Sequence, residues 1–252
     1  MRGEWCGIGG PFRAVVVGAR GGVGQAFVQS LARSEAVAEV VALGRDANWC
    51  ESSPEGKVRR LRCDITCEQS LAAVGAALSG GPPLRFIINC SGLLHTESLR
   101  PERTWRHLDL DVMRQVFEVN TFGVALLIKH LLPAMSREGR SVFATLSARV
   151  GSIEDNRIGG WYSYRASKAA QNMVVKTASI EASRRWPQLA LLALHPGTVE
   201  TALSEPFTAR LPESHDLFSS AESCRKLMDV IAQRGPADSG GFFAWDGQRI
   251  PW

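Results

Sequence analysis

The stretch that decides the fold is Phe12-Arg13-Ala14-Val15-Val16-Val17-Gly18-Ala19-Arg20-Gly21-Gly22-Val23-Gly24. Its β-branched half ends in glycine, which is typical of a buried parallel strand, and an apolar helical pattern follows the turn. A strand, a glycine turn and a helix in this order can cradle a dinucleotide pyrophosphate, because the backbone comes close and the helix N-terminus presents unpaired N–H groups. The glycine spacing is not the Gly-x-Gly-x-x-Gly fingerprint, so a plain turn is the alternative interpretation.

Strand and helix patterns alternate through the rest of the chain. Further strands are expected at residues 39–43, 58–63, 84–88, 141–146, 189–194 and 241–245, and helices at about 67–78, 111–136 and 164–185. This alternation predicts an α/β fold: a Rossmann-type doubly wound parallel sheet flanked by helices, in three layers. We expect residues 12–252 to form a single dinucleotide-binding catalytic domain, and the glycine-rich residues 1–11 to be a disordered lead-in.

The composition argues against several other classes of protein. The chain has 252 residues, of which 45% are hydrophobic and 21% charged, as in a soluble globular domain. Its net charge of +4 is modest and its arginines are scattered, so we expect no nucleic-acid partner. No apolar run approaches the roughly 18–20 residues of a membrane span, and residues 1–11 lack the apolar segment of a signal peptide. We therefore expect a cytoplasmic protein with no membrane partner, and leave open whether it is a homo-oligomer.

Six cysteines are spread over the predicted strands and helices. Cys63 and Cys67 lie four residues apart, but no histidine or second cysteine pair stands nearby at zinc-ligand spacing. We therefore expect reduced thiols and no metal site.

Tyr164 and Lys168 are the residues best suited to chemistry. Four positions apart on a helix, their side chains lie on the same face. A free phenol has a pKa of about 10, and an ammonium group one turn away favours the phenolate and lowers that pKa. A phenol tuned in this way can exchange a proton with a carbonyl or alcohol oxygen. Such pairs also occur by chance, as a half-buried ring beside a solvated charge, so the accompanying motifs decide.

Taken together, the motifs resemble the short-chain dehydrogenase/reductase family over nearly the whole chain. They follow the family's order: Gly18-x3-Gly22-x-Gly24, Asp64 after the third strand, Asn89-Cys90-Ser91-Gly92, Asn120, a serine near 147, Tyr164-x3-Lys168 and Pro196-Gly197. Residues 147–153 and 242–252 resemble a narrower branch of the family, the C-factor-like reductases.

The resemblance implies an NADP-dependent oxidoreductase that interconverts a carbonyl group (of an aldehyde, ketone or quinone) and an alcohol by hydride transfer. Tyr164 would be the general acid and base, Lys168 would lower the Tyr164 pKa and hold the nicotinamide ribose, and Asn120 would hold a water molecule. A nucleotide-binding sensor or signalling protein with little turnover is the alternative. The residues implied in cofactor binding are Gly18, Arg20, Gly22, Val23, Gly24, Arg45, Asp64, Asn89, Ser91, Gly92, Tyr164, Lys168, Pro196, Gly197, Val199 and Thr201.

One departure concerns the family's substrate-orienting serine, which stands three residues before a glycine. Ala148 has that place before Gly151, and Ser147 comes one residue earlier. A shift of one residue at a strand end turns the side chain to the opposite face. Ser147 is therefore the first candidate for the catalytic serine, Ser152 is the second, and a water molecule in place of the serine is the remaining alternative.

The choice of nucleotide is predicted from the end of the second strand. NAD-preferring relatives of this fold carry an acidic residue there, which binds the ribose 2′-OH. Here Gly44 and Arg45 take that place, Asp46 comes later, and Arg20 lies in the glycine turn. Two guanidinium groups suit a 2′-phosphate, so we expect NADP to be the cofactor.

Overall fold

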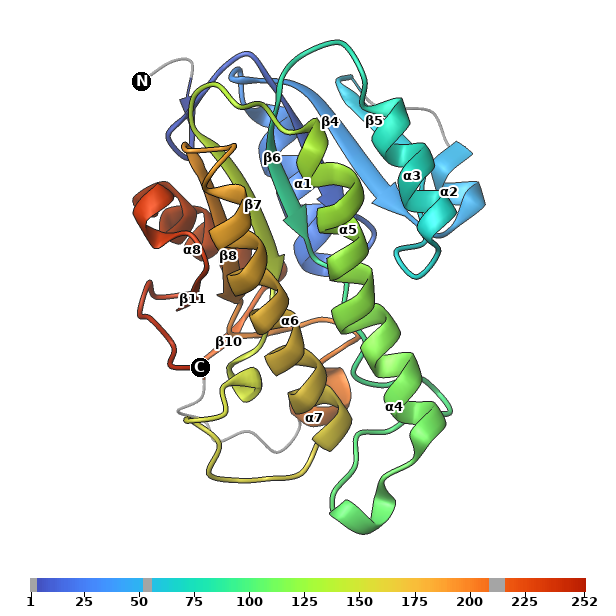
Figure 1. The fold of residues 1–252 in the computed structure, drawn as a ribbon. Helices are drawn as coiled ribbons and strands as arrows, with labels where there is room; N and C mark the ends of the chain where they lie inside the picture. Colours follow the sequence, from blue (N-terminus) through green and yellow to red (C-terminus); the bar gives the residue numbers. More distant parts are fainter. Residues whose placement is uncertain (1–3, 52–55, 209–215) are drawn as a thin grey trace.

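The computed structural model describes residues 4–51, 56–208 and 216–252. A seven-stranded parallel sheet with the order β11-β8-β7-β6-β3-β4-β5 forms the middle layer (Figure 1). Its strands are β3 (Phe12–Val17), β4 (Val37–Gly44), β5 (Val58–Arg62), β6 (Leu84–Asn89), β7 (Ser141–Leu146), β8 (Leu189–His195) and β11 (Gly241–Ala244). The strand order reverses between β3 and β6, and doubly wound sheets bind ligands at such a reversal. The predicted Rossmann-type fold is confirmed.

Helices cover both faces of the sheet (Figure 1). α1 (Gly22–Arg33) and α8 (Ser220–Gln233) lie on one face, and α3 (Glu68–Ala77), α5 (Gly123–Leu131) and α6 (Tyr162–Ala182) on the other. Each face has its own core, and successive β3 residues alternate between the two: Val15 packs on one side and Val16 on the other. The shorter elements are α2 (Ala47–Glu51), α4 (Leu110–Phe117), α7 (Glu205–Thr208), β9 (Thr198–Val199), β10 (Leu217–Phe218), η1 (Trp105–His107), η2 (Glu118–Phe122), η3 (Leu132–Ala134), η4 (Arg149–Gly151) and η5 (Pro236–Asp238).

The N-terminal segment is ordered, so the expected disorder is wrong for residues 4–11; residues 1–3 lie outside the described residues. β1 (Glu4–Trp5) and β2 (Ile8–Gly9) form a short antiparallel hairpin. Ile8 is fully buried, and the ring of Trp5 packs edge-on against Phe86 with 4.6 Å between centroids. Burial of these two apolar side chains offsets the conformational freedom that the glycines give the segment.

The helix predicted for residues 111–136 is interrupted. α4 passes into a π-helical turn, η2, before α5 continues, and the 3-10 turn η3 ends the segment. π-helical turns are rare and are frequently found at functional sites. This one carries Asn120, which is 1% exposed.

Contrary to the expectation that no apolar run reaches this length, the segment Leu110–Ala134 is long enough to span a membrane, and its most apolar window has the mean hydropathy (1.3) of a membrane-spanning helix. In the fold 44% of its most apolar window is buried, including Val116, Val124 and Leu127. Packing as a helix of the layer beside α6 accounts for this apolar composition.

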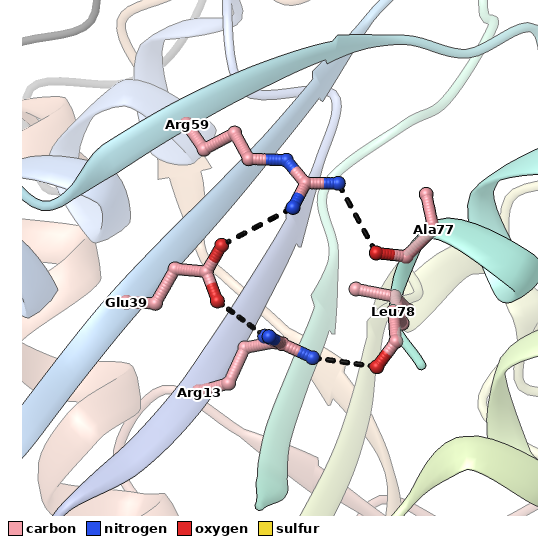
Figure 2. A network of polar contacts seen from close by, with 5 residues as sticks. All are labelled: Arg13, Glu39, Arg59, Ala77 and Leu78. Atoms are coloured by element: carbon pink, nitrogen blue, oxygen red, sulfur yellow. Dashed lines mark hydrogen bonds and ion pairs between the residues drawn. The ribbon is translucent and has the colours of Figure 1, made fainter. Parts of the chain in front are cut away.

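A partly buried ion-pair network joins three strands at the amino-terminal edge of the sheet (Figure 2). Glu39 of β4 contacts Arg13 of β3 at 2.5 Å and Arg59 of β5 at 3.5 Å. The two arginines also donate to the last carbonyls of the α3 segment, Arg13 to Leu78 at 2.6 Å and Arg59 to Ala77 at 3.1 Å. Since the Arg13 side chain is only 6% exposed, its charge needs these partners. The network therefore lies at the edge of the sheet opposite the carboxyl ends of the strands.

Candidate active site

The glycine turn after β3 forms a tight cradle at the carboxyl edge of the sheet. Gly18 has a φ of +72°, in the left-handed region that favours glycine. A Cβ on Gly24 would overlap the Gly18 carbonyl, so the turn can lie against α1 only with glycine there. The N-cap of α1, Gly21, makes no side-chain capping bond. Within the part of the chain that the structure describes, the first N–H groups of this twelve-residue helix therefore have no side-chain cap.

Two other segments that the sequence predicted for cofactor binding come to this turn. A Cβ on Gly18 would lie 3.0 Å from the Ser91 nitrogen, and one on Gly22 would lie 3.0 Å from the Thr201 methyl group. Asn89 shapes the segment after β6, since its Oδ1 accepts a hydrogen bond of 3.0 Å from Ser91 N. The glycine turn, the end of β6 and the segment after β9 thus meet at one place. Of the other predicted residues, Pro196 and Gly197 follow β8, and Val199 lies in β9.

The end of β4 holds a pairing that the sequence did not reveal. Arg20 of the glycine turn forms an ion pair with Asp46, whose Oδ1 also accepts a hydrogen bond of 3.1 Å from Trp49 N. The Trp49 amide and the Arg20 guanidinium lower the Asp46 pKa. Arg45 is exposed beside them. A carboxylate therefore does lie near the strand end, although it is already engaged by Arg20.

Asp64 follows β5 and is held by its own loop. Its Oδ1 accepts hydrogen bonds from the Thr66 N–H at 2.9 Å and the Thr66 hydroxyl at 2.8 Å. Burial opposes ionisation, but the Thr66 hydrogen bonds together with Arg45 and Arg62 leave the Asp64 pKa lowered. The carboxylate is thus fixed beside the exposed guanidinium of Arg45.

Tyr164 and Lys168 lie in the first two turns of α6, and both are buried, at 7% and 2% exposure. The Lys168 Nζ lies 5.8 Å from the Tyr164 ring centroid and donates hydrogen bonds of 2.9 Å to Leu146 O and to Gln171 Oε1. Burial raises the pKa of Tyr164 and lowers the pKa of Lys168 to about 7. The expected lowering of the Tyr164 pKa is therefore not found, because burial of the phenol itself disfavours its charged form.

Asn120 lies within the same region. Its side chain bonds Leu93 twice, accepting from the Leu93 N–H and donating to the Leu93 carbonyl, each at 2.8 Å, and it donates to Ser167 Oγ at 3.0 Å. A Cβ on Gly92 would lie 3.7 Å from Asn120 Oδ1 and 3.8 Å from Lys168 Nζ. Gly92 thus lies beside both Asn120 and Lys168. That Asn120 holds a water molecule stays a prediction.

Both serines that were candidates for orienting the substrate are engaged within the fold. Ser147 is buried and donates to Asn172 Oδ1 at 2.7 Å. Ser152, 1% exposed, accepts from the Asp155 N–H at 3.1 Å. Ala148, which stands between β7 and η4, is partly exposed. The placement of Ser147 and Ser152 therefore gives neither of them support as the catalytic serine.

The start of α6 is anchored by Glu102, which carried no signal in the sequence. This carboxylate is 3% exposed and accepts hydrogen bonds from the Ser163 hydroxyl and, at 3.2 Å, from the Ser163 N–H. The Glu102 carbonyl accepts a third bond, of 2.5 Å, from the N–H of Trp161. Trp161 is held in the left-handed conformation, at φ +51°, immediately before the first turn of α6. Such strain in a non-glycine residue persists only where the surroundings fix it.

Aromatic rings from three segments lie beside Tyr164. Trp161 contacts Tyr164 edge-on at 6.2 Å and Phe207 of α7 at 4.9 Å, and Phe207 in turn contacts His95 at 5.5 Å. The His95 ring also lies 3.0 Å from the Ala202 carbonyl. The segment after β9 therefore reaches the Tyr164 region through Phe207, which contacts Trp161.

A cavity of about 360 Å³ lies on that segment, lined by Glu200, Thr201, Glu205 and Leu217. Its two glutamates would repel a pyrophosphate, and neither Tyr164 nor Lys168 lines it. We therefore place the candidate active site at the glycine turn and α6 rather than in this cavity.

Comparison with known proteins gives a family match, two similar relatives and a similar solved structure. The short chain dehydrogenase family model matches residues 13–211. The chain is 33% identical over 190 residues to 1-hydroxy-2-glutathionyl-2-methyl-3-butene dehydrogenase of Rhodococcus sp. (strain AD45), covering 75% of this chain and 78% of that protein. It is 33% identical over 145 residues to the C-signal of Myxococcus xanthus, covering 58% and 81%. Among solved structures, NADPH-bound carbonyl reductase from chicken fatty liver matches with a TM-score of 0.81 at 25% identity, covering 99% of this chain and 96% of that one.

Proposed function

The chain belongs to the short-chain dehydrogenase family of oxidoreductases, and from this premise we propose that it interconverts a small carbonyl compound and its alcohol with NADP, using Tyr164 as general acid and base. The observation that carries the proposal is the placement of Lys168: its Nζ lies 5.8 Å from the Tyr164 ring centroid, and both this Nζ and Asn120 Oδ1 lie beside Gly92. A proton donor, a cation and an amide meet there, at the carboxyl edge of a doubly wound sheet. Those are the groups that protonation of a carbonyl oxygen requires.

The glycine cradle fits a dinucleotide phosphate. The close approach of Gly24 to Gly18 and the uncapped N-terminus of α1 leave backbone N–H groups for the pyrophosphate, with Ser91 and Thr201 beside them. When bound, NADPH supplies the hydride for the carbonyl carbon. The carbonyl reductase of chicken fatty liver, with NADPH bound, supports this choice of cofactor.

The chain's own residues supply the proton and the charge. Burial keeps the Tyr164 phenol protonated at neutral pH, which is the form that donates a proton to a carbonyl oxygen. The Lys168 ammonium group has three N–H donors, and two of them bond Leu146 and Gln171. The third is left for the cofactor ribose, and the positive charge stabilises the phenolate that proton donation leaves behind.

The test of this function is NADPH oxidation, followed by absorbance, against a panel of aldehydes, ketones and quinones. We expect turnover with at least one class of carbonyl compound, and a loss of kcat of about 10²–10⁴-fold or more when Phe replaces Tyr164. NADPH binding without turnover across the whole panel would count against the enzyme.

A nucleotide-binding signalling protein is the second candidate, because the chain is 33% identical over 145 residues to the C-signal of Myxococcus xanthus. A protein that only senses a nucleotide needs no proton donor beside the cofactor. The presence of Tyr164 with Lys168 one turn away therefore favours the enzyme. The panel assay separates the two candidates, since only the enzyme consumes NADPH.

The missing serine leads to a prediction for Ala148→Ser. In the family a serine at this place helps to orient the carbonyl group, so a hydroxyl restored there should raise kcat by about threefold to tenfold, the effect of one hydrogen bond. Ser147→Ala is the matched comparison: it should cost about 1 kcal/mol of stability through the lost bond to Asn172 and leave kcat near that of the wild type. Steady-state kinetics and thermal unfolding of both variants check this. A collapse of kcat in folded Ser147→Ala would return the role to Ser147.

A further inference from the structure

Gln171 is a buried polar residue to which the proposed reaction gives no role. It lies on α6, three residues after Lys168, and is fully buried. Its Oε1 accepts the hydrogen bond of 2.9 Å from Lys168 Nζ. Its Nε2 donates to Thr145 Oγ1 at 3.2 Å and to Leu146 O at 3.1 Å. Because both N–H donors of the amide are used by acceptors on β7, the oxygen has to face Lys168.

The partners of Gln171 are themselves fixed. Thr145 Oγ1 also accepts a hydrogen bond of 3.1 Å from Asn89 Nδ2, and Asn89 and Thr145 are both fully buried. The chain of polar groups runs from β6 through β7 to α6. A fully bonded network of this kind holds one arrangement, because any rotation of an amide would leave a buried group without a partner. The oxygen beside Lys168 is therefore held in place from the sheet.

We propose that Gln171 is a positioning residue of the active site, which keeps the Lys168 side chain charged and fixed through the hydrogen bond to its carbonyl oxygen. The inference rests on the proposed function, since that function gives the Lys168 charge its task. Within the described residues, the Lys168 ammonium group has two acceptors, the Leu146 carbonyl and Gln171. A buried ammonium group depends on such acceptors, and hydrogen bonds to charged groups are the stronger ones.

The charge on Lys168 is sensitive to this bond. Burial brings the Lys168 pKa to about 7, so the charged and neutral forms are close to equal near neutral pH. The groups that face this side chain are Tyr164 from α6, the Leu146 carbonyl from β7 and the backbone of Gly151 from η4, with Gly92 beside its Nζ. Tyr164 is the one titratable group among them. Loss of an acceptor disfavours the charged form, so the Lys168 pKa should fall further when Gln171 is replaced by an apolar residue.

Gln171→Met and Gln171→Glu test the proposal by the pH dependence of kcat. Met has a similar length but no hydrogen-bond acceptor, so the pH above which kcat falls should move about one unit lower. At a fixed pH on this alkaline limb of the profile, kcat should then be about tenfold below that of the wild type. At the acid end of the profile kcat should stay near that of the wild type. Glu restores an acceptor and adds a negative charge, so the limb should move to higher pH than in the wild type.

A second readout follows Lys168 without turnover. NMR titration of the lysine side chains, with Lys168→Arg used for assignment, should show a lower Lys168 pKa in Gln171→Met and a higher one in Gln171→Glu. An unchanged Lys168 titration would overturn the proposal, whatever the activity. A shifted titration with an unchanged pH profile in an active enzyme would overturn the part that concerns the reaction. An inactive wild type with shifted titrations would overturn the proposed function and leave the Gln171–Lys168 bond supported.

Thr145→Val is the matched control. It removes one of the two partners of the Gln171 amide nitrogen and the partner of Asn89 Nδ2, while the remaining bond to Leu146 O still orients the amide and its oxygen still accepts from Lys168. We expect lower stability with the alkaline limb and the Lys168 titration in place. Equal shifts in Thr145→Val and Gln171→Met would mean that any loosening of this region moves Lys168, and would overturn the specific role of Gln171.

Discussion

Tyr164→Phe is expected to lower kcat by about 10²–10⁴-fold or more while folding and NADPH affinity stay near those of the wild type. The substitution removes only the hydroxyl group that donates the proton. Within the described residues no hydrogen bond joins this hydroxyl to another group, so its loss leaves no buried partner unpaired. The ring that packs edge-on against Trp161 remains.

Tyr162→Phe is the matched control for this experiment. Tyr162 lies on the same helix two residues earlier and is 36% exposed, and the residue four places after it is Ala166 rather than a lysine. The control should keep wild-type kinetics and stability. Steady-state kinetics, NADPH titration by fluorescence and thermal unfolding distinguish the outcomes. Near-normal kcat in Tyr164→Phe would mean that another group supplies the proton.

The fold could be predicted from the sequence because parallel strands that are buried on both faces consist of continuous apolar runs. Val15 and Val16 face opposite cores, so both have to be apolar, and the pattern is plain without any tertiary knowledge. The N-terminal hairpin was not predictable in this way. Trp5 and Ile8 are isolated in a glycine-rich segment, and the sequence does not tell that Phe86, 81 positions after Trp5, provides a surface for them.

The candidate site was predictable where spacing along one element decides the geometry. Tyr164 and Lys168 had to share a face of α6 because they are four apart. Their environment was not predictable, because it comes from distant segments: Glu102 reaches Ser163 across 61 residues, and Leu146 reaches Lys168 across 22. For the same reason the net effect on the Tyr164 pKa differs from the expectation. Sequence spacing shows the nearby charge but not the depth of burial that outweighs it.

The serine question shows the same limit at a single strand end. The one-residue shift indicated that Ser147 and Ala148 point to opposite sides, which left the role of Ser147 open. The Ser147 hydroxyl donates to Asn172, which lies 25 residues further along the chain. Its position relative to the end of β7 depends on how α6 packs against the sheet.

NADPH is expected to bind roughly tens- to a thousandfold more tightly than NADH. The preference would come from Arg20 and Arg45. Each guanidinium group can donate charge-assisted hydrogen bonds to the 2′-phosphate. Arg20 is paired with Asp46, which on its own would favour the 2′-OH of NAD. The Arg20 side chain is 56% exposed and that of Asp46 37%, and exposed pairs of this kind contribute little. A phosphate that carries up to two negative charges should therefore displace the carboxylate from Arg20.

The double variant Arg20→Ala with Arg45→Ala should erase most of this preference and change NADH affinity little, because NADH has no 2′-phosphate for the arginines to bind. Arg33→Ala, which removes an exposed arginine at the far end of α1, is the control for net charge and should keep the preference. Titration of both nucleotides against the wild type and the two variants measures it. Equal affinities in the wild type would refute NADP as the preferred cofactor. A preference that survives in the double variant would mean that groups other than these two guanidiniums bind the phosphate.

Asp46→Asn tests whether the Asp46 carboxylate competes with the phosphate for Arg20. If it does, NADPH should bind more tightly to this variant than to the wild type, while NADH should not.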